Sequence, residues 1–169
     1  MDNAMELQLI KHKDILFRDL LRVVDIKSIS WPYPVESQLK WIIDNVCEDD
    51  IHVLLRDKET DIAYLSLSQV SALIDGQQTA FSGVGCVCSR YHGRGAGETL
   101  IKKANNYLIS CKKKGLLFCK DNLIDFYKKY DWILLPNDRV IFDSPHLDVF
   151  TMVYNCDIIG KMEYGDRFF

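Results

Sequence analysis

The stretch YHGRGAGETL, residues 91 to 100, has the residue types and the spacing of an anion-binding turn. Its glycines, Gly93, Gly95 and Gly97, allow backbone conformations and close approaches that a Cβ atom would prevent. A helical pattern begins directly after them, and the N-terminus of a helix offers unpaired N–H groups and a partial positive charge. The stretch therefore predicts a site for a phosphate-bearing ligand, with a tight turn that binds nothing as the alternative.

The glycine spacing excludes two kinds of phosphate ligand. A nucleoside triphosphate loop needs G-x-x-x-x-G-K-[ST], whereas here Gly93 and Gly97 are one residue too close and Glu98 stands where the lysine should be. A dinucleotide site needs G-x-G-x-x-G in an early βαβ unit, whereas this sequence has G-x-G-x-G after three strand-like runs that look antiparallel.

The elements that must position this turn follow from hydrophobic periodicity. Helical spacing predicts helices over residues 15–24, 35–46, 97–113 and 122–130. Apolar or alternating runs predict strands over residues 5–10, 51–55, 62–70, 79–88, 116–119, 132–135 and 149–155. This order predicts an α/β (α+β) fold, an antiparallel meander feeding a βαβ unit, in one domain of residues 1–169.

Prolines and glycines predict where these elements end or bend. We expect SISWPYP, residues 28–34, to break the first helix, and residues 136–146 to form a loop. Gly115 is expected to cap the third helix in a left-handed conformation. Gly83 and Gly85 are expected to mark a bulge, or the close approach of a ligand, within the strand over 79–88.

Composition narrows the class of protein. With 48% hydrophobic and 27% charged residues and a net charge of -3, the chain has neither a disordered nor a polycationic composition, which argues against a nucleic-acid partner. A signal-like leader and a long apolar span are both missing from the sequence, so we expect a cytoplasmic protein with no membrane partner, either a monomer or a homodimer.

The six cysteines match no zinc pattern, so we expect no metal site. We expect buried free thiols instead, with Cys86, Cys88 and Cys119 in strands and Cys111 on a helix's apolar face.

Two segments resemble the GCN5-related N-acetyltransferases. Residues 87–104, VCSRYHGRGAGETLIKKA, resemble the family's pyrophosphate motif [Arg/Gln]-x-x-Gly-x-[Gly/Ala], with His92 at the Arg/Gln position and Gly95 and Gly97 as the glycines. A shifted alignment that starts at Arg90 also fits the letters. Residues 122–132, NLIDFYKKYDW, resemble the family's later helix and turn. Residues 108–132 are also faintly similar to aminoglycoside 2′-N-acetyltransferases.

The resemblance implies a fold, an activity and a co-substrate. The implied fold is a mixed, mostly antiparallel sheet of six to seven strands flanked by about four helices, with the fourth and fifth strands splayed. The implied activity is transfer of an acetyl group from acetyl-CoA to a primary amine of a small-molecule acceptor, less readily a peptide. A catalytically silent acyl-CoA-binding or regulatory domain is the alternative.

The resemblance also assigns residues to roles. Tyr127 matches the family tyrosine that donates a proton to the CoA thiolate, with Tyr130 as its substitute and simple packing as the alternative. Trp31, Tyr33, Ser82 and Gly83 fall where the family binds its acceptor. The coenzyme A site would comprise Gly85, Cys86, Val87, His92, Gly93, Arg94, Gly95, Ala96, Gly97 and Glu98.

Two departures from the family pattern concern chemistry. Gly83 stands where many members carry the glutamate that deprotonates the amine, so another group or another proton route is needed. The candidates are Glu36, His52, Asp61 and His146, each with an ordinary structural role as the alternative. His92 would carry a pH-dependent charge in place of a constant one. Near the C-terminal end, Asp157, Glu163 and Asp166 are candidates to meet a cationic acceptor.

Overall fold

The computed structural model describes residues 5–144, 148–157 and 160–169. The chain divides into two units. Unit 1 comprises residues 1–68, 85–103 and 169, and unit 2 comprises residues 69–84 and 104–168. The long strands β3 (Thr60–Ile74) and β4 (Gln77–Ser89) and the helix α3 (Ala96–Ser110) contribute residues to both units.

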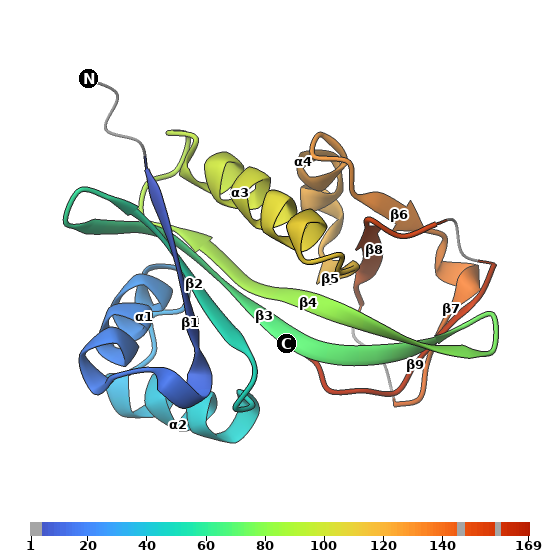
Figure 1. The fold of residues 1–169 in the computed structure, drawn as a ribbon, viewed down its shortest axis with the longest axis horizontal. Helices are drawn as coiled ribbons and strands as arrows, with labels where there is room; N and C mark the ends of the chain where they lie inside the picture. The colour runs from blue at the N-terminus through green and yellow to red at the C-terminus, as the bar shows by residue number, and fades with distance from the viewer. Residues whose placement is uncertain (1–4, 145–147, 158–159) are drawn as a thin grey trace. The chain divides into compact units, whose positions relative to one another are not determined.

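A nine-stranded sheet has the order β1-β2-β3-β4-β5-β8-β6, and β9 pairs with both β3 and β7 (Figure 1). β4 pairs in parallel with β5, as β7 does with β9, and the β1–β2, β2–β3, β3–β9, β5–β8 and β6–β8 pairings are antiparallel. The remaining strands are β1 (Glu6–Lys11), β2 (Ile51–Asp57), β5 (Gly115–Cys119), β6 (Ile133–Leu135), β7 (Val140–Phe142), β8 (Phe150–Tyr154) and β9 (Met162–Tyr164). This mixed, mostly antiparallel sheet confirms the predicted fold class, with more strands than the six or seven expected.

In unit 1, two helices pack on the sheet through their apolar faces. α1 (Phe17–Ser30) and α2 (Val35–Asn45) lie together beside β1 and β2 (Figure 1). Burial of the shared core stabilises this layer, because each buried aliphatic side chain contributes about 1.5 to 3 kcal/mol. The core residues are Val23, Val24, Ile26, Ile42, Leu54, Tyr64 and Cys88.

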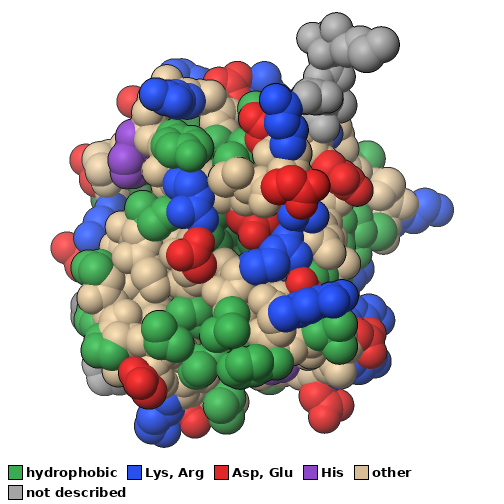
Figure 2. Space-filling view, turned by 90° about the vertical axis from the view of Figure 1, so that its left-hand side faces the viewer, with side chains coloured by type: hydrophobic (Ala, Val, Ile, Leu, Met, Phe, Trp, Pro, Cys, Tyr) green, Lys and Arg blue, Asp and Glu red, His purple; other side chains and the backbone are tan. Residues whose placement is uncertain are grey.

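The outer face of unit 1 is partly apolar. Figure 2 shows hydrophobic side chains in the lower part of this view, below a region where basic and acidic side chains alternate. The exposed apolar residues of the two helices include Phe17, Leu21, Ile29, Val35 and Ile43.

In unit 2, hydrogen bonds of the Asn105 side chain join α3 to the segment that follows the helix α4 (Ile124–Lys128). The Asn105 side chain accepts a hydrogen bond from the Trp132 indole N–H at 3.1 Å and donates one to the Tyr130 carbonyl oxygen at 2.9 Å. The Trp132 ring stacks on Tyr154. A second aromatic group comprises Phe118, Phe142, Tyr164 and Phe168.

The prediction for Gly115 was wrong. α3 ends at Ser110, and Lys112 takes the left-handed conformation with φ +54°, while the Lys113 N–H donates to the Leu108 carbonyl oxygen at 2.8 Å. Gly115 instead begins β5. A Cβ atom there would lie 2.6 Å from the Trp132 ring, so the glycine is needed for close packing.

Two other predictions were also wrong, and one was confirmed with a later boundary. The segment over 28–34 does end α1, but the helix continues to Ser30, because a proline restricts the residue directly before it and Pro32 therefore disfavours helix at Trp31. The expected loop over 136–146 contains β7 and a short 3-10 helix, Asn137–Arg139, and the C-terminal tail contains β9. Cys111 is exposed, since it lies just beyond the end of α3.

The other short elements are the 3-10 helices His12–Asp14 and Asp121–Leu123. All six cysteines are free thiols, and Cys88 and Cys119 are buried in strands as predicted, whereas Cys86 is only half-buried. Over the described ranges, no helix has the length and apolar character needed to cross a membrane.

Candidate active site

The glycine stretch forms an exposed turn between β4 and α3, in unit 1. Gly93 and Gly95 have φ angles of +72° and +76°, a conformation that side chains disfavour. A Cβ atom at either position would meet no described atom within 4 Å, so the turn needs glycine for its backbone conformation. α3 begins at Ala96, and its first N–H groups have no carbonyl oxygen one turn earlier to bond. The turn thus leaves open space at Gly93 and Gly95 directly before the helix N-terminus, whose N–H groups can bind a phosphate group.

Charged side chains surround this turn. Tyr91, His92 and Arg94 are exposed, and the Arg94 guanidinium lies 5.3 Å from the centre of the Tyr91 ring. The Glu98 carboxylate pairs with Lys102 at 2.8 Å along α3, which balances its negative charge. The exposed side of the turn therefore carries the Arg94 cation and the His92 ring.

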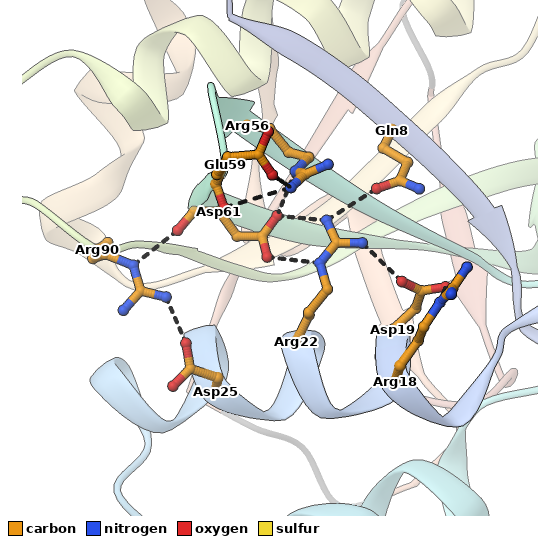
Figure 3. A network of polar contacts seen from close by, with 9 residues as sticks. All are labelled: Gln8, Arg18, Asp19, Arg22, Asp25, Arg56, Glu59, Asp61 and Arg90. Atoms are coloured by element: carbon orange, nitrogen blue, oxygen red, sulfur yellow. Dashed lines mark hydrogen bonds and ion pairs between the residues drawn. The ribbon is translucent and has the colours of Figure 1, made fainter.

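Arg90 connects the start of the turn to α1 and β3 of unit 1 through hydrogen bonds (Figure 3). Its backbone N–H donates to the Ile62 carbonyl oxygen at 2.8 Å. Its side chain donates to the Asp61 carbonyl oxygen at 2.8 Å and to the Asp25 carboxylate at 2.6 Å. The Asp61 carboxylate also accepts two hydrogen bonds from Arg22, at 2.6 and 2.8 Å, which raises the pKa of that guanidinium. These bonds join α1 and β3 to the residue that leads into the turn.

β4 departs from regular strand geometry just before this turn. Cys86 has a φ angle of +52°, which is unusual for a residue with a side chain and marks a local distortion. A Cβ atom at Gly85 would lie 2.6 Å from the Phe169 carbonyl carbon, so the glycine permits this close approach. The expected bulge or close approach is therefore present at Gly85 and Cys86, and the approaching group is the chain's own Phe169.

A cavity of about 450 Å³ in unit 1 is lined by α1, α2, the segment between them, β4 and Phe169. It brings together Trp31 and Tyr33, predicted for the acceptor, and Cys86, predicted for the co-substrate. The Gln38 amide fixes one wall by donating to the Trp31 carbonyl oxygen at 2.5 Å. The described lining residues are Lys27, Trp31, Tyr33, Ser37, Gln38, Trp41, Cys86 and Phe169.

Sequence reasoning missed Lys27, Gln38 and Trp41 in this cavity. A signal for Lys27 was present, because it follows Val23 by four residues and Leu20 by seven, on the apolar stripe of α1. A lysine on such a stripe is rarely buried unless it is paired. Its 4% exposed fraction makes it a buried cation beside the cavity.

The structure places the other two predicted acceptor residues elsewhere. Ser82 and Gly83 lie in unit 2, where both are buried and pair with Gly115 and Leu116 of β5. The Ser82 N–H donates to the Lys114 carbonyl oxygen at 2.8 Å. Neither residue lines the cavity of unit 1 as the structure describes it.

Tyr127, the predicted proton donor, lies on α4 in unit 2. Its side chain is 5% exposed, and its ring packs edge-on against Phe126 and Trp132. Burial, followed by the nearby Cys119, raises the pKa of the phenol. The hydroxyl therefore stays protonated at neutral pH and gives up its proton less readily than a free tyrosine.

Two of the four candidate bases are engaged in structural contacts. The His52 ring lies 2.8 Å from the Tyr64 hydroxyl and 2.9 Å from the His12 ring. Burial above all lowers the His52 pKa to about 4, so this ring is neutral at pH 7. Asp61 is held by Arg22, whereas Glu36 is exposed in the first turn of α2. The candidate His146 lies outside the described residues.

A second cavity, of about 370 Å³, lies in unit 2 and is lined by acidic residues. The Asp166 carboxylate accepts backbone N–H groups of Ser71 and Arg167, at 2.9 and 2.8 Å. Glu163 pairs with Lys161 at 2.5 Å. Glu163 and Asp166, two of the residues predicted for a cationic acceptor, thus line this cavity with their charges already engaged.

The described residues contain no cluster of three or more His, Cys, Asp or Glu side chains able to hold a metal ion.

No protein-family model matches the sequence, and no curated protein sequence matches it. Solved structures do match in fold. The GNAT-family N-acetyltransferase YhbS from Escherichia coli, in complex with CoA, is 13% identical, with a TM-score of 0.64 over 98% of this chain and 93% of that one. YlbP from Bacillus subtilis, an N-acetyltransferase in complex with coenzyme A, is 16% identical, with a TM-score of 0.59 over 95% and 100%.

An acyl-CoA N-acyltransferase from Pseudomonas aeruginosa is 15% identical, with a TM-score of 0.62 over 89% of this chain and 99% of that one. At these identities the likeness concerns the fold alone. The chain therefore has the fold of the GCN5-related N-acetyltransferases, as its sequence predicted.

Proposed function

We propose that this protein is an acyl-CoA-dependent N-acetyltransferase that acts on a primary amine of a small molecule in the cytoplasm, with residues 1–169 forming one catalytic domain. The observation that carries the proposal is the exposed turn at Gly93 and Gly95, which leads into the N-terminus of α3 on a fold shared with N-acetyltransferases. A bound acetyl-CoA would supply the activated acetyl thioester. The protein's own residues would hold the coenzyme, orient the acceptor and manage protons.

The coenzyme's pyrophosphate fits the turn by charge and by space. Backbone N–H groups from His92 to Glu98 would donate to phosphate oxygens, and the positive end of α3 would favour their charge. The Arg94 side chain adds a cation on the exposed side. The bonds from Arg90 to Asp25 and Asp61 favour the alignment that begins at His92, because they already occupy the guanidinium that the shifted alignment needs.

The acyl end of the coenzyme would lie along β4. Cys86 has a left-handed backbone conformation within β4, and an N–H around Gly85, Cys86 and Val87 would polarise the acyl carbonyl. A fixed donor of this kind is worth about 3 to 4 kcal/mol in other acyl-transfer enzymes. Cys86 also lines the cavity with Trp31 and Tyr33, so the acceptor amine would approach from there.

Proton transfer would use water and Tyr127. No Asp or Glu side chain is among the described residues that line the cavity, so the amine would lose its proton to solvent before it attacks. The rate should then rise with pH toward the pKa of the amine. Tyr127 would return a proton to the departing thiolate.

A second candidate is an acyl-CoA-binding domain without catalysis. Gly83, which stands at the position of the family's glutamate, is the observation that favours it. Both candidates predict coenzyme binding, and only the first predicts release of CoA thiol in the presence of an amine.

Binding and turnover of acetyl-CoA test the proposal together. Saturating acetyl-CoA should raise the melting temperature, because a ligand of the native state stabilises it. Gly95→Val should abolish this shift, since valine disfavours the left-handed conformation at residue 95, while Lys40→Met on α2 should keep it. A thiol-detecting assay with amino acids, polyamines, aminoglycosides and arylalkylamines then separates the two candidates. An unchanged melting temperature would reject both of them.

A further inference from the structure

A basic groove in unit 2 has no part in the proposed function. Its volume is about 380 Å³, and all of its described lining belongs to unit 2. The lining comes from residue 69 of β3, from residues 78–82 of β4 and from residues 112–114, which follow α3. We call this hollow the lysine groove, because residues 112–114 are all lysines.

The three consecutive lysines give the groove its charge. Lys112 and Lys114 are exposed and Lys113 is half-buried, and no ion pair in the described part of the chain involves any of them. The helix dipole favours a cation just beyond the C-terminus of α3, but this accounts for one lysine more readily than for three. No Asp or Glu side chain is among the residues described as lining the groove. Its positive charge is therefore not balanced within that lining.

The β4 side of the groove is the edge of a strand. Side chains of a strand point alternately to its two faces, so consecutive residues line one groove together where it runs along the strand's edge. Residues 78–82 are consecutive, and all five line the groove. The Ser82 N–H donates to the Lys114 carbonyl oxygen at 2.8 Å, and the pairing of β4 with β5 begins at Ser82. The groove thus follows the part of β4 that precedes this pairing.

Peptide groups of β4 are unpaired on this edge. The N–H and C=O groups at every second position of a strand point to the same side, so those of Gln78 and Ala80 point the same way as the Ser82 N–H. Both residues are exposed, and the described contacts include no partner for their peptide groups on this edge. An unpaired strand edge is a template for an added strand. The groove therefore offers peptide donors and acceptors beside three cations.

These two features together favour one kind of partner. An extended peptide has N–H and C=O groups that pair with a strand edge, and acidic side chains on it would meet the lysines. A nucleic acid would satisfy the lysines, but it has no peptide groups to pair with β4. A second copy of this chain would bring the lysines of both copies together, and like charges at close range repel each other.

We propose that the lysine groove binds an extended, acidic segment of a partner protein, which adds a strand to β4 beside Lys112, Lys113 and Lys114. The free edge runs from Gln77 to Phe81, roughly 16 Å at the rise of a strand, so a segment of about five or six residues covers it. Acidic residues at alternate positions of the segment place their carboxylates on one of its faces. The inference does not depend on the proposed function.

A labelled peptide tests the inference on the full chain. The probe is a fluorescein-labelled hexapeptide of alternating glutamate and valine, and the readout is fluorescence anisotropy. We expect saturable binding, weakened at least about tenfold when glutamine replaces glutamate, because charged hydrogen bonds are lost. The same peptide with every backbone N–H methylated keeps its charges and should also bind at least about tenfold more weakly. No saturable binding of the first peptide, or equal binding of the methylated one, would overturn the inference.

Charge-reversed variants assign the binding to the groove. The double variant Lys112→Glu with Lys114→Glu should weaken binding of the glutamate peptide at least about tenfold, because carboxylates then repel it. Lys128→Glu with Lys129→Glu is the matched control, since it changes the net charge equally at exposed lysines of unit 2 that are absent from the described lining. Melting temperatures verify that both variants fold. Equal losses of binding in the two variants would show attraction by net charge alone and overturn the inference.

Two further measurements separate the other occupants. Fluorescein-labelled oligothymidylate should bind at least about tenfold more weakly than the peptide, because it cannot pair with β4. Tighter binding of the oligonucleotide, lost in Lys112→Glu with Lys114→Glu, would make the groove a nucleic-acid site and overturn the inference. Sedimentation of the free chain should show the same mass with and without the peptide. A dimer that the peptide dissociates would mean that a second copy occupies the groove, which would also overturn it.

Discussion

The two cavities differ in the side chains that line them. The cavity of unit 1 is lined by the rings of Trp31, Tyr33 and Trp41, with the Lys27 ammonium 4.1 Å from the centre of the Trp41 ring. In unit 2 the Asp166 carboxylate accepts two backbone N–H groups and Glu163 pairs with Lys161. Folding alone accounts for Asp166 and Glu163, because their charges are engaged within the protein. Aromatic surface that lines a cavity is typical of a ligand site, whereas engaged carboxylates are typical of a structural role.

The largest expected effect contrasts Asp61, a buried charge of unit 1, with Lys40, an exposed charge of the same unit. Asp61→Ala removes one of the two anionic partners of Arg22 and the anion 3.4 Å from Arg56 Nε, so it should lower the free energy of unfolding by about 3 to 4 kcal/mol. Lys40→Met breaks an exposed pair with Asp44 and should change the free energy of unfolding by less than about 1 kcal/mol. Chemical denaturation of both variants measures the difference. Equal losses in the two variants would show that the bonds of Asp61 do not stabilise the fold.

The buried His52 of unit 1 should make the stability of the protein depend on pH. The His52 pKa is lowered to about 4, first by burial and then by the charges of His12 and Lys27. Because the unfolded histidine takes up a proton near pH 6.5 and the folded one does not until about pH 4, stability should fall as pH decreases between these values. The loss between pH 7 and 5 should be about 2 kcal/mol.

Denaturation curves of the unmodified protein and of His52→Gln, recorded at both pH values, isolate this contribution. The variant should lose correspondingly less stability between pH 7 and 5. Equal losses in the two proteins would show that His52 does not remain neutral in the fold.

Tyr127 is the residue of unit 2 for which we expect an effect on catalysis. Its side chain is 5% exposed, and the described contacts include no hydrogen bond of its hydroxyl. Tyr127→Phe should lower kcat about tenfold, or about 1.4 kcal/mol, with little change in acetyl-CoA affinity. Tyr130→Phe is the matched control on the same segment. If Tyr130→Phe alone lowers kcat, the proton donor is Tyr130.

The smallest expected effect concerns the acidic cavity. Asp166→Asn weakens the hydrogen bonds to Ser71 and Arg167 and should cost about 1 kcal/mol of stability. It should leave the preference among acceptor amines within twofold of the unmodified protein. A change in that preference would move the acceptor to unit 2 and contradict the comparison.

The sequence predicted the parts of the fold and site that depend on local pattern. The glycine turn was identified because Gly93, Gly95 and the start of α3 are contiguous, and backbone conformation there follows from residue type. The three-residue strands β7 and β9 were missed, because their pairing with each other is decided by tertiary contacts. Gly115 was misassigned because its requirement comes from Trp132, far along the chain.

The cavity of unit 1 could be predicted only in part. Trp31 and Tyr33 each directly precede a proline, which marked them as candidates, whereas Lys27 and Trp41 are ordinary helix residues in the sequence. They reach the same cavity as Cys86 and Phe169 only through the packing of α1 and α2. Sequence periodicity could identify Lys27 as out of place on an apolar stripe, but not what lies beside it.

The most direct test of the account is to follow the acetyl group itself. Acetyl-CoA labelled with carbon-13 in the acetyl group is incubated with the protein and a mixture of amino acids, polyamines, aminoglycosides and arylalkylamines, and the products are identified by mass spectrometry. The account predicts a labelled N-acetylated amine, formed in step with CoA thiol. Labelled acetate alone, or no labelled product while acetyl-CoA still raises the melting temperature, would contradict the claim that this protein transfers acetyl groups to amines.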